Sequence, residues 1–392
     1  MVVNKIRLEN QADHCRIMAC VRRESAPGGE YDLWFRFPHQ LGAQLIADAD
    51  PFFAALLLPA MAMGERLLIE GPVSPALLGN ASLIQDLFAS WVPKARRIAI
   101  EAAPRAPGRE VGSRGTGLFF SGGVDSFYSL LKHSEAITDL LLVDRLDSKQ
   151  MSSPAISRAT RERASRVADR LGKQLIVTET NARELFVPAV VDWKDYHGAV
   201  LAAIGLALRP ALSRVFIAAT HTYDFLRPWG SSPLLDPLWS TDAVQLVHDG
   251  AEATRTDKVM NWICRSDLAL ENLRVCLSND DQYNCGRCEK CMRTMIPIYV
   301  AGCLEKCPVF PHVLPVQEAA FHKYRNEGYI DYALQNVALL EQKPDQSAFD
   351  RQLIGAIESA IRRSRKKMAR RERKEFGCQR SWRDWFRDWK LL

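Results

Sequence analysis

The stretch Leu118-Phe119-Phe120-Ser121-Gly122-Gly123-Val124-Asp125-Ser126 decides the fold that we expect of this 392-residue chain. Its three leading apolar residues predict a strand, and the helical pattern Phe127 to Lys132 follows directly after Ser126. Adjacent glycines let backbone N–H groups approach an anion closely, and a helix start adds unpaired donors and a positive dipole. The stretch therefore predicts a phosphate-binding loop between a strand and a helix.

The side chains of this loop each have an expected part in binding a polyphosphate. The hydroxyls of Ser121 and Ser126 are expected to donate to phosphate oxygens, and Asp125 to contact a Mg²⁺ ion that lies beside them. The loop is not a Walker A sequence, because no Gly-Lys-Ser/Thr follows at the required spacing. A glycine turn without a ligand is the alternative. The expected nucleotide-binding residues are Ser121, Gly122, Gly123, Val124, Asp125, Ser126 and, after the second strand, Asp144.

Four cysteines with the spacing C-x8-C-x2-C-x2-C form the second motif. Closely spaced thiols in an intracellular chain usually bind metal, and four thiolates close a tetrahedral zinc site with a structural role. A redox disulfide or an iron–sulfur cluster is the alternative. Cys303 and Cys307 lie close enough in sequence to substitute for a ligand. The four expected zinc ligands are Cys276, Cys285, Cys288 and Cys291, whereas Cys15, Cys20, Cys264 and Cys378 are expected to be core or incidental thiols.

The loop and the cysteine motif together resemble the PP-loop ATP pyrophosphatases, and among them the 7-cyano-7-deazaguanine synthase family. Lys258, in TRTDKVMNW, and Arg293, after the last cysteine, match positions of that family. The likeness covers about residues 115 to 305. It implies an ATP-dependent C–N ligase of queuosine biosynthesis, which adenylates the carboxylate of 7-carboxy-7-deazaguanine and releases pyrophosphate. Ammonia then displaces AMP to form an amide, and a second ATP drives its dehydration to a nitrile.

The resemblance also implies the cofactors and the catalytic residues. ATP, Mg²⁺ and Zn²⁺ are the expected cofactors, and the expected catalytic residues are Asp125, Ser126 and Lys258. Lys258 is expected to stabilise charge on the phosphates, with Arg255 as a weaker companion, and an exposed helix lysine is its alternative. The zinc site is expected to shape the substrate pocket. His221 is a candidate acid or base, whereas His197 is expected to be a core or rim histidine.

Two loops depart from that family. The segment after the second expected strand reads DRLDSKQ from Asp144 to Gln150, and the segment Thr220 to Arg227 keeps an aspartate without the family's usual substrate sequence. Three functions therefore stay open. The first is a deazaguanine-type ligase, whose acceptor is ammonia, an amine or, as in relatives of bacterial antiviral defence operons, a protein. The second is a PP-loop enzyme that thiolates or ligates tRNA, and the third is a non-catalytic nucleotide-binding protein.

The order of apolar patterns predicts an α/β fold with a Rossmann-like parallel sheet. Alternating strands and helices from Gly117 onward place the loop, Asp144 and Thr220 to Asp224 at the carboxyl ends of strands. A hairpin is expected around Pro27-Gly28-Gly29. The expected domains are an N-terminal α+β domain (1–103), a linker (104–116), a PP-loop domain (117–262), a four-cysteine zinc module (263–310) and a helical C-terminal region (311–392) with a basic, Trp-rich tail.

The charge of the chain is concentrated at its end. Residues 351–392 hold 14 Lys and Arg against 5 Asp and Glu, so the rest of the chain is weakly acidic although the formal net charge is +6. This tail could bind RNA or an acidic protein, or its aromatic residues Trp382, Trp385, Phe386 and Trp389 could dock on the enzyme. No apolar run is long enough to cross a membrane, and the N-terminus lacks a signal pattern. We therefore expect a cytoplasmic enzyme with a small carboxylate substrate, and a homodimer stays open.

Overall fold

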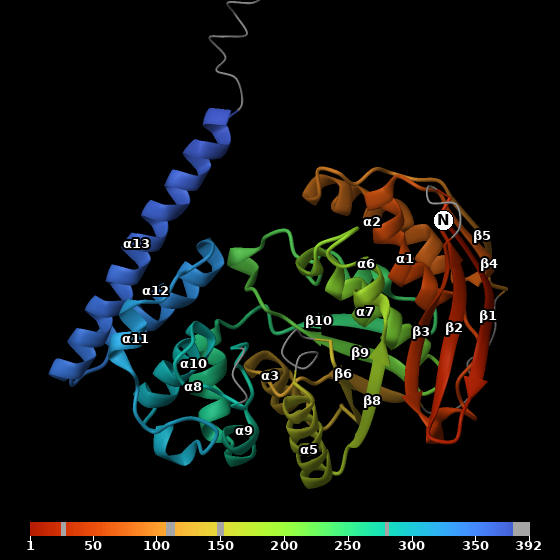
Figure 1. The fold of residues 1–392 in the computed structure, drawn as a ribbon. Coiled ribbons are helices and arrows are strands. Elements are labelled where there is room, and N and C mark those ends of the chain that lie inside the picture. The colour runs from red at the N-terminus through yellow and green to blue at the C-terminus, as the bar shows by residue number, and fades with distance from the viewer. Residues whose placement is uncertain (25–28, 107–113, 147–152, 279–281, 379–392) are drawn as a thin grey trace, which may run out of the picture. The chain divides into compact units, whose positions relative to one another are not determined.

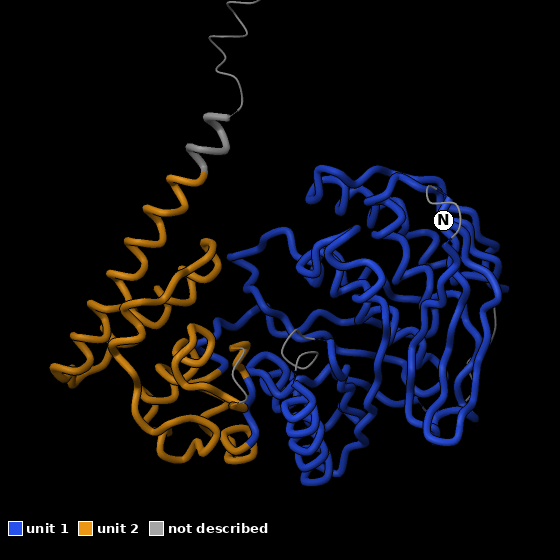
Figure 2. Tube along the Cα trace, in the orientation of Figure 1, with its two compact units in different colours: residues 1–258, 272–274 blue, residues 259–271, 275–392 orange. Residues whose placement is uncertain are grey.

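The computed structural model describes residues 1–24, 29–106, 114–146, 153–278 and 282–378, with side chains as far as Arg371 (Figure 1). The chain forms two compact units (Figure 2). Unit 1 consists of Met1–Lys258 with Asn272–Arg274, and unit 2 consists of Val259–Glu271 with Val275–Leu392.

A ten-stranded sheet with the order β10-β9-β6-β7-β8-β3-β2-β1-β4-β5 is the frame of unit 1. Its first five strands pair in parallel, so the predicted parallel α/β sheet is confirmed. These strands are β10 (Gln245–Asp249), β9 (Leu212–Ala218), β6 (Gly115–Phe119), β7 (Asp139–Val143) and β8 (Gln174–Thr180).

The other half of the sheet comes from residues 2–104. It contains β1 (Val2–Asn10), β2 (His14–Arg22), β3 (Glu30–Pro38), β4 (Leu67–Val73) and β5 (Ile100–Pro104). Strands β2 and β3 pair in antiparallel with Val21 opposite Tyr31, as expected of the predicted hairpin, whereas Pro27 and Gly28 of its predicted turn lie outside the described residues.

One antiparallel junction joins the two halves into a single sheet. Phe35 of β3 lies opposite Thr180 of β8. Next to it, the amide of Asn181 accepts a hydrogen bond from the Trp34 N–H (3.0 Å) and donates one to the Asp32 carbonyl (2.8 Å). The sequence predicted separate domains at 1–103 and 117–262 with a linker between them, but both segments belong to one sheet and one compact unit. Backbone pairing between residues more than 140 positions apart is the physical reason for this difference.

Helix α3 of unit 1 forms where the pattern Phe127 to Lys132 predicted a helix. Helix α5 ends at Gly172, which adopts the left-handed conformation (φ +62°) expected of a C-cap glycine. Helices α1 and α7 pack against each other, and the Tyr196 hydroxyl donates to the Ala55 carbonyl (2.7 Å). The helices are α1 (Asp50–Met63), α2 (Pro75–Trp91), α3 (Val124–Lys132), α5 (Pro154–Leu171), α6 (Ala182–Phe186) and α7 (Trp193–Ala207), with 3₁₀ turns at His39–Leu41, Tyr223–Phe225 and Asp236–Trp239.

Unit 2 is helical over the part of the chain that the structure describes. Helix α8 (Arg255–Asn261) starts in unit 1 and ends in unit 2, and the predicted zinc module and C-terminal region fall into one unit instead of two. The predicted aromatic stripe of Trp382, Trp385, Phe386 and Trp389 lies outside the described residues. The remaining helices are α9 (Asp267–Asn272), α10 (Glu289–Val300), α11 (Val316–Ala320), α12 (Glu327–Glu341) and α13 (Ala348–Cys378), with 3₁₀ turns at Ile263–Arg265 and Leu304–Lys306.

Hydrophobicity along these helices does not suggest a membrane span. Within the described ranges, no helix combines the length and the apolar character needed to cross a bilayer.

Candidate functional site

The loop between β6 and α3 has the strand–loop–helix geometry that the sequence predicted. Gly122 has a φ of +74°, a conformation that residues with a Cβ rarely adopt. Gly123 is the N-cap of α3 and is extended (φ −80°, ψ 167°), without a side-chain cap on the helix. The backbone N–H of Arg274 donates to the Gly122 carbonyl (2.8 Å), which holds the turn in place. The first turn of α3 therefore starts directly at the predicted phosphate-binding residues.

Asp125, in the first turn of α3, is paired with two cations from α8. One Oδ of Asp125 lies 2.6 Å from Nη2 of Arg255, and the other lies 3.1 Å from Nζ of Lys258. Arg255 and Lys258 are three residues apart on their helix, so they point to the same side. The three charges sum to +1, and this local excess of positive charge favours an anionic ligand.

Lys258 is held in a fixed position by its surroundings. Its side chain is only 3% exposed, so the alternative of an exposed helix lysine is wrong. Nζ also donates to the Ala219 carbonyl (2.9 Å) at the end of β9 and lies 5.3 Å from the ring of Tyr128. Gly250 follows β10 with a φ of +94°, and a Cβ there would lie 3.1 Å from the Tyr128 ring and 3.4 Å from Nζ. Tyr128 and Gly250 thus define where the ammonium group sits.

The two serines of the loop differ in their surroundings. Ser121 is exposed, whereas Ser126 is 4% exposed and donates its hydroxyl to the Gly123 carbonyl (3.0 Å). Ser126 therefore stabilises the turn from within, and Ser121 presents its hydroxyl at the surface. The expected contact of Asp125 with Mg²⁺ does not fit this arrangement, because both carboxylate oxygens already face cationic side chains.

Asp144 lies directly after β7, at the same edge of the sheet, but its carboxylate faces α5. It is 2% exposed and accepts hydrogen bonds from the hydroxyl of Ser157 (2.7 Å) and the backbone N–H of Arg145 (2.9 Å). Arg161 forms an ion pair with it. In this structure the carboxylate ties α5 to the end of β7.

Sequence reasoning missed a second carboxylate at this edge, Asp249 at the end of β10. It accepts hydrogen bonds from Ser129 Oγ (2.6 Å) and Lys132 Nζ (2.9 Å) of α3, and it lies 2.9 Å from Nε2 of His133. Burial alone would raise the pKa of Asp249, but the hydrogen bonds with Ser129, His133 and Lys132 lower it below its usual range. The sequence feature that could have identified Asp249 is its position directly after an apolar run, as for Asp144. Asp249 fixes α3 against the sheet behind the loop.

The two histidines considered from sequence lie beside Trp229. His197 is half-buried, packs between Trp193 (5.9 Å) and Trp229 (5.6 Å), and has a pKa lowered by burial, which agrees with the expected core or rim histidine. His221 lies 5.4 Å from the Trp229 ring and 6.0 Å from that of Phe225, in the segment that follows β9.

The four motif cysteines of unit 2 come together as predicted. Their sulfur atoms all lie within 4.8 Å of one another, and two pairs, Cys276 with Cys288 and Cys285 with Cys291, are 3.9 Å apart. A tetrahedral ion with Zn–S bonds of about 2.3 Å places its sulfurs about 3.8 Å apart, so the cluster could hold a metal ion such as zinc. Gly286, in the left-handed conformation (φ +71°), makes the turn between the second and third cysteines.

Cys303 and Cys307 are not members of the cluster. The thiol of Cys307 donates to the Leu270 carbonyl (3.2 Å), and that of Cys303 to the Cys264 carbonyl (3.6 Å). Cys15 and Cys20 are buried in β2, as expected of core thiols.

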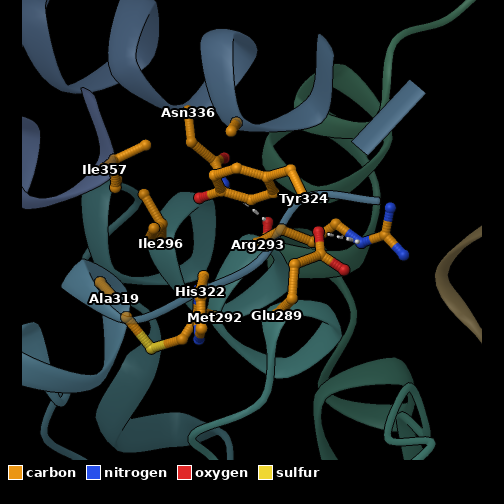
Figure 3. A pocket seen from close by; sticks show the side chains of 10 residues that line it. Glu289, Met292, Arg293, Ile296, Ala319, His322, Tyr324, Asn336 and Ile357 are labelled. Carbon is orange, nitrogen blue, oxygen red and sulfur yellow. Dashed lines mark hydrogen bonds and ion pairs between the residues drawn. The ribbon is translucent and has the colours of Figure 1, made fainter. Parts of the chain in front are cut away.

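Arg293, which the resemblance singled out, borders a small pocket in unit 2 (Figure 3). Its guanidinium lies 4.2 Å from the ring of Tyr332 and 3.5 Å from the carboxylate of Glu289. Its carbonyl accepts a hydrogen bond from the amide of Asn336 (3.3 Å), and Tyr324 covers the same pocket. The contacts of Arg293 thus link α10 to α12.

Comparisons with known proteins found no relative of this chain. A scan against protein-family models, a search of curated proteins and a search of solved structures each found no match.

Proposed function

We propose that this protein is an ATP-dependent C–N ligase that adenylates a carboxylate and releases pyrophosphate. The substrate proposed is 7-carboxy-7-deazaguanine or a related acid, and the acceptor of the activated acyl group is ammonia or an amine. The proposal rests on the resemblance of the loop and cysteine motifs to the 7-cyano-7-deazaguanine synthase family. Among the structural observations, the pairing of Lys258 and Arg255 with Asp125 at the start of α3 is the one that carries it.

The geometry supports binding of a polyphosphate at the loop. The start of α3 at Gly123 has no side-chain cap, so its first backbone N–H groups are available as donors for an anion, and the helix dipole adds to the attraction. Phosphate oxygens that enter there would compete with Asp125 for hydrogen bonds from Arg255 and Lys258. Because Lys258 is also anchored to the Ala219 carbonyl, its ammonium group needs little reorganisation to contact the ligand.

The proposed reaction then follows from the position of the anion. The substrate carboxylate attacks the α-phosphorus, the bond between that phosphorus and the bridging oxygen breaks, and pyrophosphate leaves with charge stabilised by Lys258 and Arg255. A Mg²⁺ ion bound to the ATP would supply charge neutralisation of its phosphates. Ammonia or an amine then attacks the acyl carbon, loses a proton and displaces AMP, which gives an amide. Where ammonia is the acceptor, a second ATP would adenylate the oxygen of the primary amide and release pyrophosphate, and loss of AMP and of the nitrogen-bound protons would then give a nitrile. A closed zinc site with four thiolate ligands has no open position for water, so its proposed role is structural.

Mass spectrometry tests this proposal directly. The purified zinc-containing protein is incubated with Mg-ATP and 7-carboxy-7-deazaguanine, with and without ammonia, and AMP, pyrophosphate and new adducts are followed. AMP that forms only with the deazaguanine supports the proposal, and the adduct mass identifies the acceptor. If tRNA and not the deazaguanine stimulates AMP formation, the tRNA-modifying alternative is correct. ATP binding without AMP under all conditions would leave a non-catalytic nucleotide-binding protein.

A further inference from the structure

Helix α13 divides into a packed part and a part without packing. It contacts α11 and α12, and its buried residues are Asp350, Leu353, Ile357, Ala360, Ile361 and Ser364. From Arg365 to Arg371 no described side chain is buried, and only Met368 is partly covered. Figure 1 shows α13 continuing well past α11 and α12. This part of the helix therefore contributes little to the core of unit 2.

Positive charges begin at the end of the packed part and continue through the unpacked part. No acidic residue occurs between Ser359 and Arg371. Three of the cations have partners, because Arg362 pairs with Glu358, Arg365 pairs with Glu327, and Arg363 donates to Ser359 and to the Ala320 carbonyl. Among the described contacts, no ion pair or hydrogen bond involves the other four side chains. The seven cations are Arg362, Arg363, Arg365, Lys366, Lys367, Arg370 and Arg371.

The order of these cations places like charges next to one another. Arg362, Lys366 and Arg370 form one row at a spacing of four residues, and Arg363, Lys367 and Arg371 form a second row beside it. Like charges at this spacing destabilise a helix. Favourable interaction with the helix dipole is confined to the last turn, which starts after Arg371. The rows therefore weaken the isolated helix, and a polyanion bound along them would remove that repulsion.

We propose that residues 362–371 of α13 form a binding surface for the phosphate backbone of a nucleic acid. Each row extends over about 12 Å, and a helix of about 10–12 Å diameter fits a major groove about 12 Å wide. A membrane surface is a poorer partner, because an interfacial helix needs a continuous apolar face and the apolar residues of this segment are only Met368 and Ala369. Recognition depends on charge and not on base sequence.

Fluorescence anisotropy of the full-length protein with labelled 20-base-pair DNA and RNA duplexes tests this proposal. At least four phosphate contacts predict a slope of about −3.6 for log K against log salt on DNA, or about a 100-fold loss of affinity between 50 and 200 mM salt. Two DNA duplexes of unrelated sequence should bind equally well. A preference for DNA or for RNA would identify which backbone is bound.

The decisive variant is Lys366→Gln/Lys367→Gln/Arg370→Gln/Arg371→Gln, because glutamine keeps the helix propensity and removes four charges. We expect its salt slope to become shallower by about 3 to 4. A control with four exposed cations of unit 1 removed, Arg22→Gln/Arg158→Gln/Arg166→Gln/Lys194→Gln, should bind like the wild type. Circular dichroism verifies the fold of both variants. Equal binding by the helix variant and the wild type would overturn the proposal, as would binding of polyglutamate with the affinity measured for the duplexes.

Discussion

At the scale of single residues, the ammonium group of Lys258 has the most defined environment in the candidate site. It contacts the loop carboxylate Asp125, the Ala219 carbonyl and the face of Tyr128. Such a group is pre-positioned to stabilise a developing negative charge. We therefore expect Lys258→Gln to lower the rate of substrate-dependent AMP formation by about 100- to 1000-fold, measured by mass spectrometry of the nucleotides.

The control for this variant is Lys173→Gln, which removes a lysine that donates to the Ser134 carbonyl away from the loop. It should leave AMP formation unchanged. A Lys258→Gln protein that forms AMP at the wild-type rate would exclude a catalytic part for this lysine.

Gly250 is the second residue whose substitution has a clear expected outcome. An alanine there would carry a left-handed φ and would press its Cβ against Tyr128 and Lys258. We expect Gly250→Ala to lower the free energy of unfolding by about 1–3 kcal/mol, measured by urea denaturation.

The matched control is Gly79→Ala in helix α2, where no atom lies within 4 Å of the added Cβ. That variant should stabilise the protein by about 0.5–1 kcal/mol, because glycine is unfavourable inside a helix. If Gly250→Ala leaves the free energy of unfolding unchanged, the backbone after β10 relaxes easily around the added Cβ.

At the scale of elements, the start of α13 depends on one buried carboxylate. Asp350 accepts hydrogen bonds from the backbone N–H and hydroxyl of Ser347 (both 2.8 Å), Lys343 (2.8 Å) and Tyr299 (3.0 Å). Burial alone would raise the pKa of Asp350, but these contacts, with Lys343 foremost, lower it to about 2.

A carboxyl group whose pKa is lowered in the folded state stabilises the protein at pH values above the pKa that the group has in the unfolded chain. This contribution is lost as the pH falls from about 4 through 2. We expect the wild type to lose about 2 kcal/mol of stability from this group over that range, measured by urea unfolding at several pH values. In Asp350→Asn this part of the pH dependence should be missing, and the variant should already be less stable at pH 7. If the free energy of unfolding depends on pH in the same way in both proteins, Asp350 is not the group responsible for the loss of stability at low pH.

At the scale of the whole molecule, the two compact units should respond differently to loss of metal. The four clustered thiols lie in unit 2, whereas the ten-stranded sheet lies in unit 1. Four unbound thiolates repel one another, and structural zinc sites supply folding free energy. We expect one zinc ion per chain by elemental analysis, and we expect a strong chelator to expose unit 2 to proteolysis while the sheet of unit 1 stays resistant.

Two cysteine variants separate the ligands from the nearby thiols. Cys288→Ala should lose the zinc ion and much of its soluble expression, whereas Cys303→Ala should keep one zinc ion per chain, because its thiol is bonded to a carbonyl outside the cluster. A zinc-free Cys288→Ala protein with an intact unit 2 would show that the metal is dispensable for folding.

The sequence by itself determined the features that depend on neighbouring residues. The strand–loop–helix at Ser121 to Ser126, the hairpin of β2 and β3, the end of α5 at Gly172 and the cysteine cluster all follow from local backbone preferences and fixed spacing. The tertiary structure alone decided that β3 pairs with β8, that Arg255 and Lys258 reach Asp125 across at least 130 residues, and that Asp249 anchors α3. Such contacts join residues that no local pattern relates, because they depend on which strand edges and helix faces meet when the whole chain is packed.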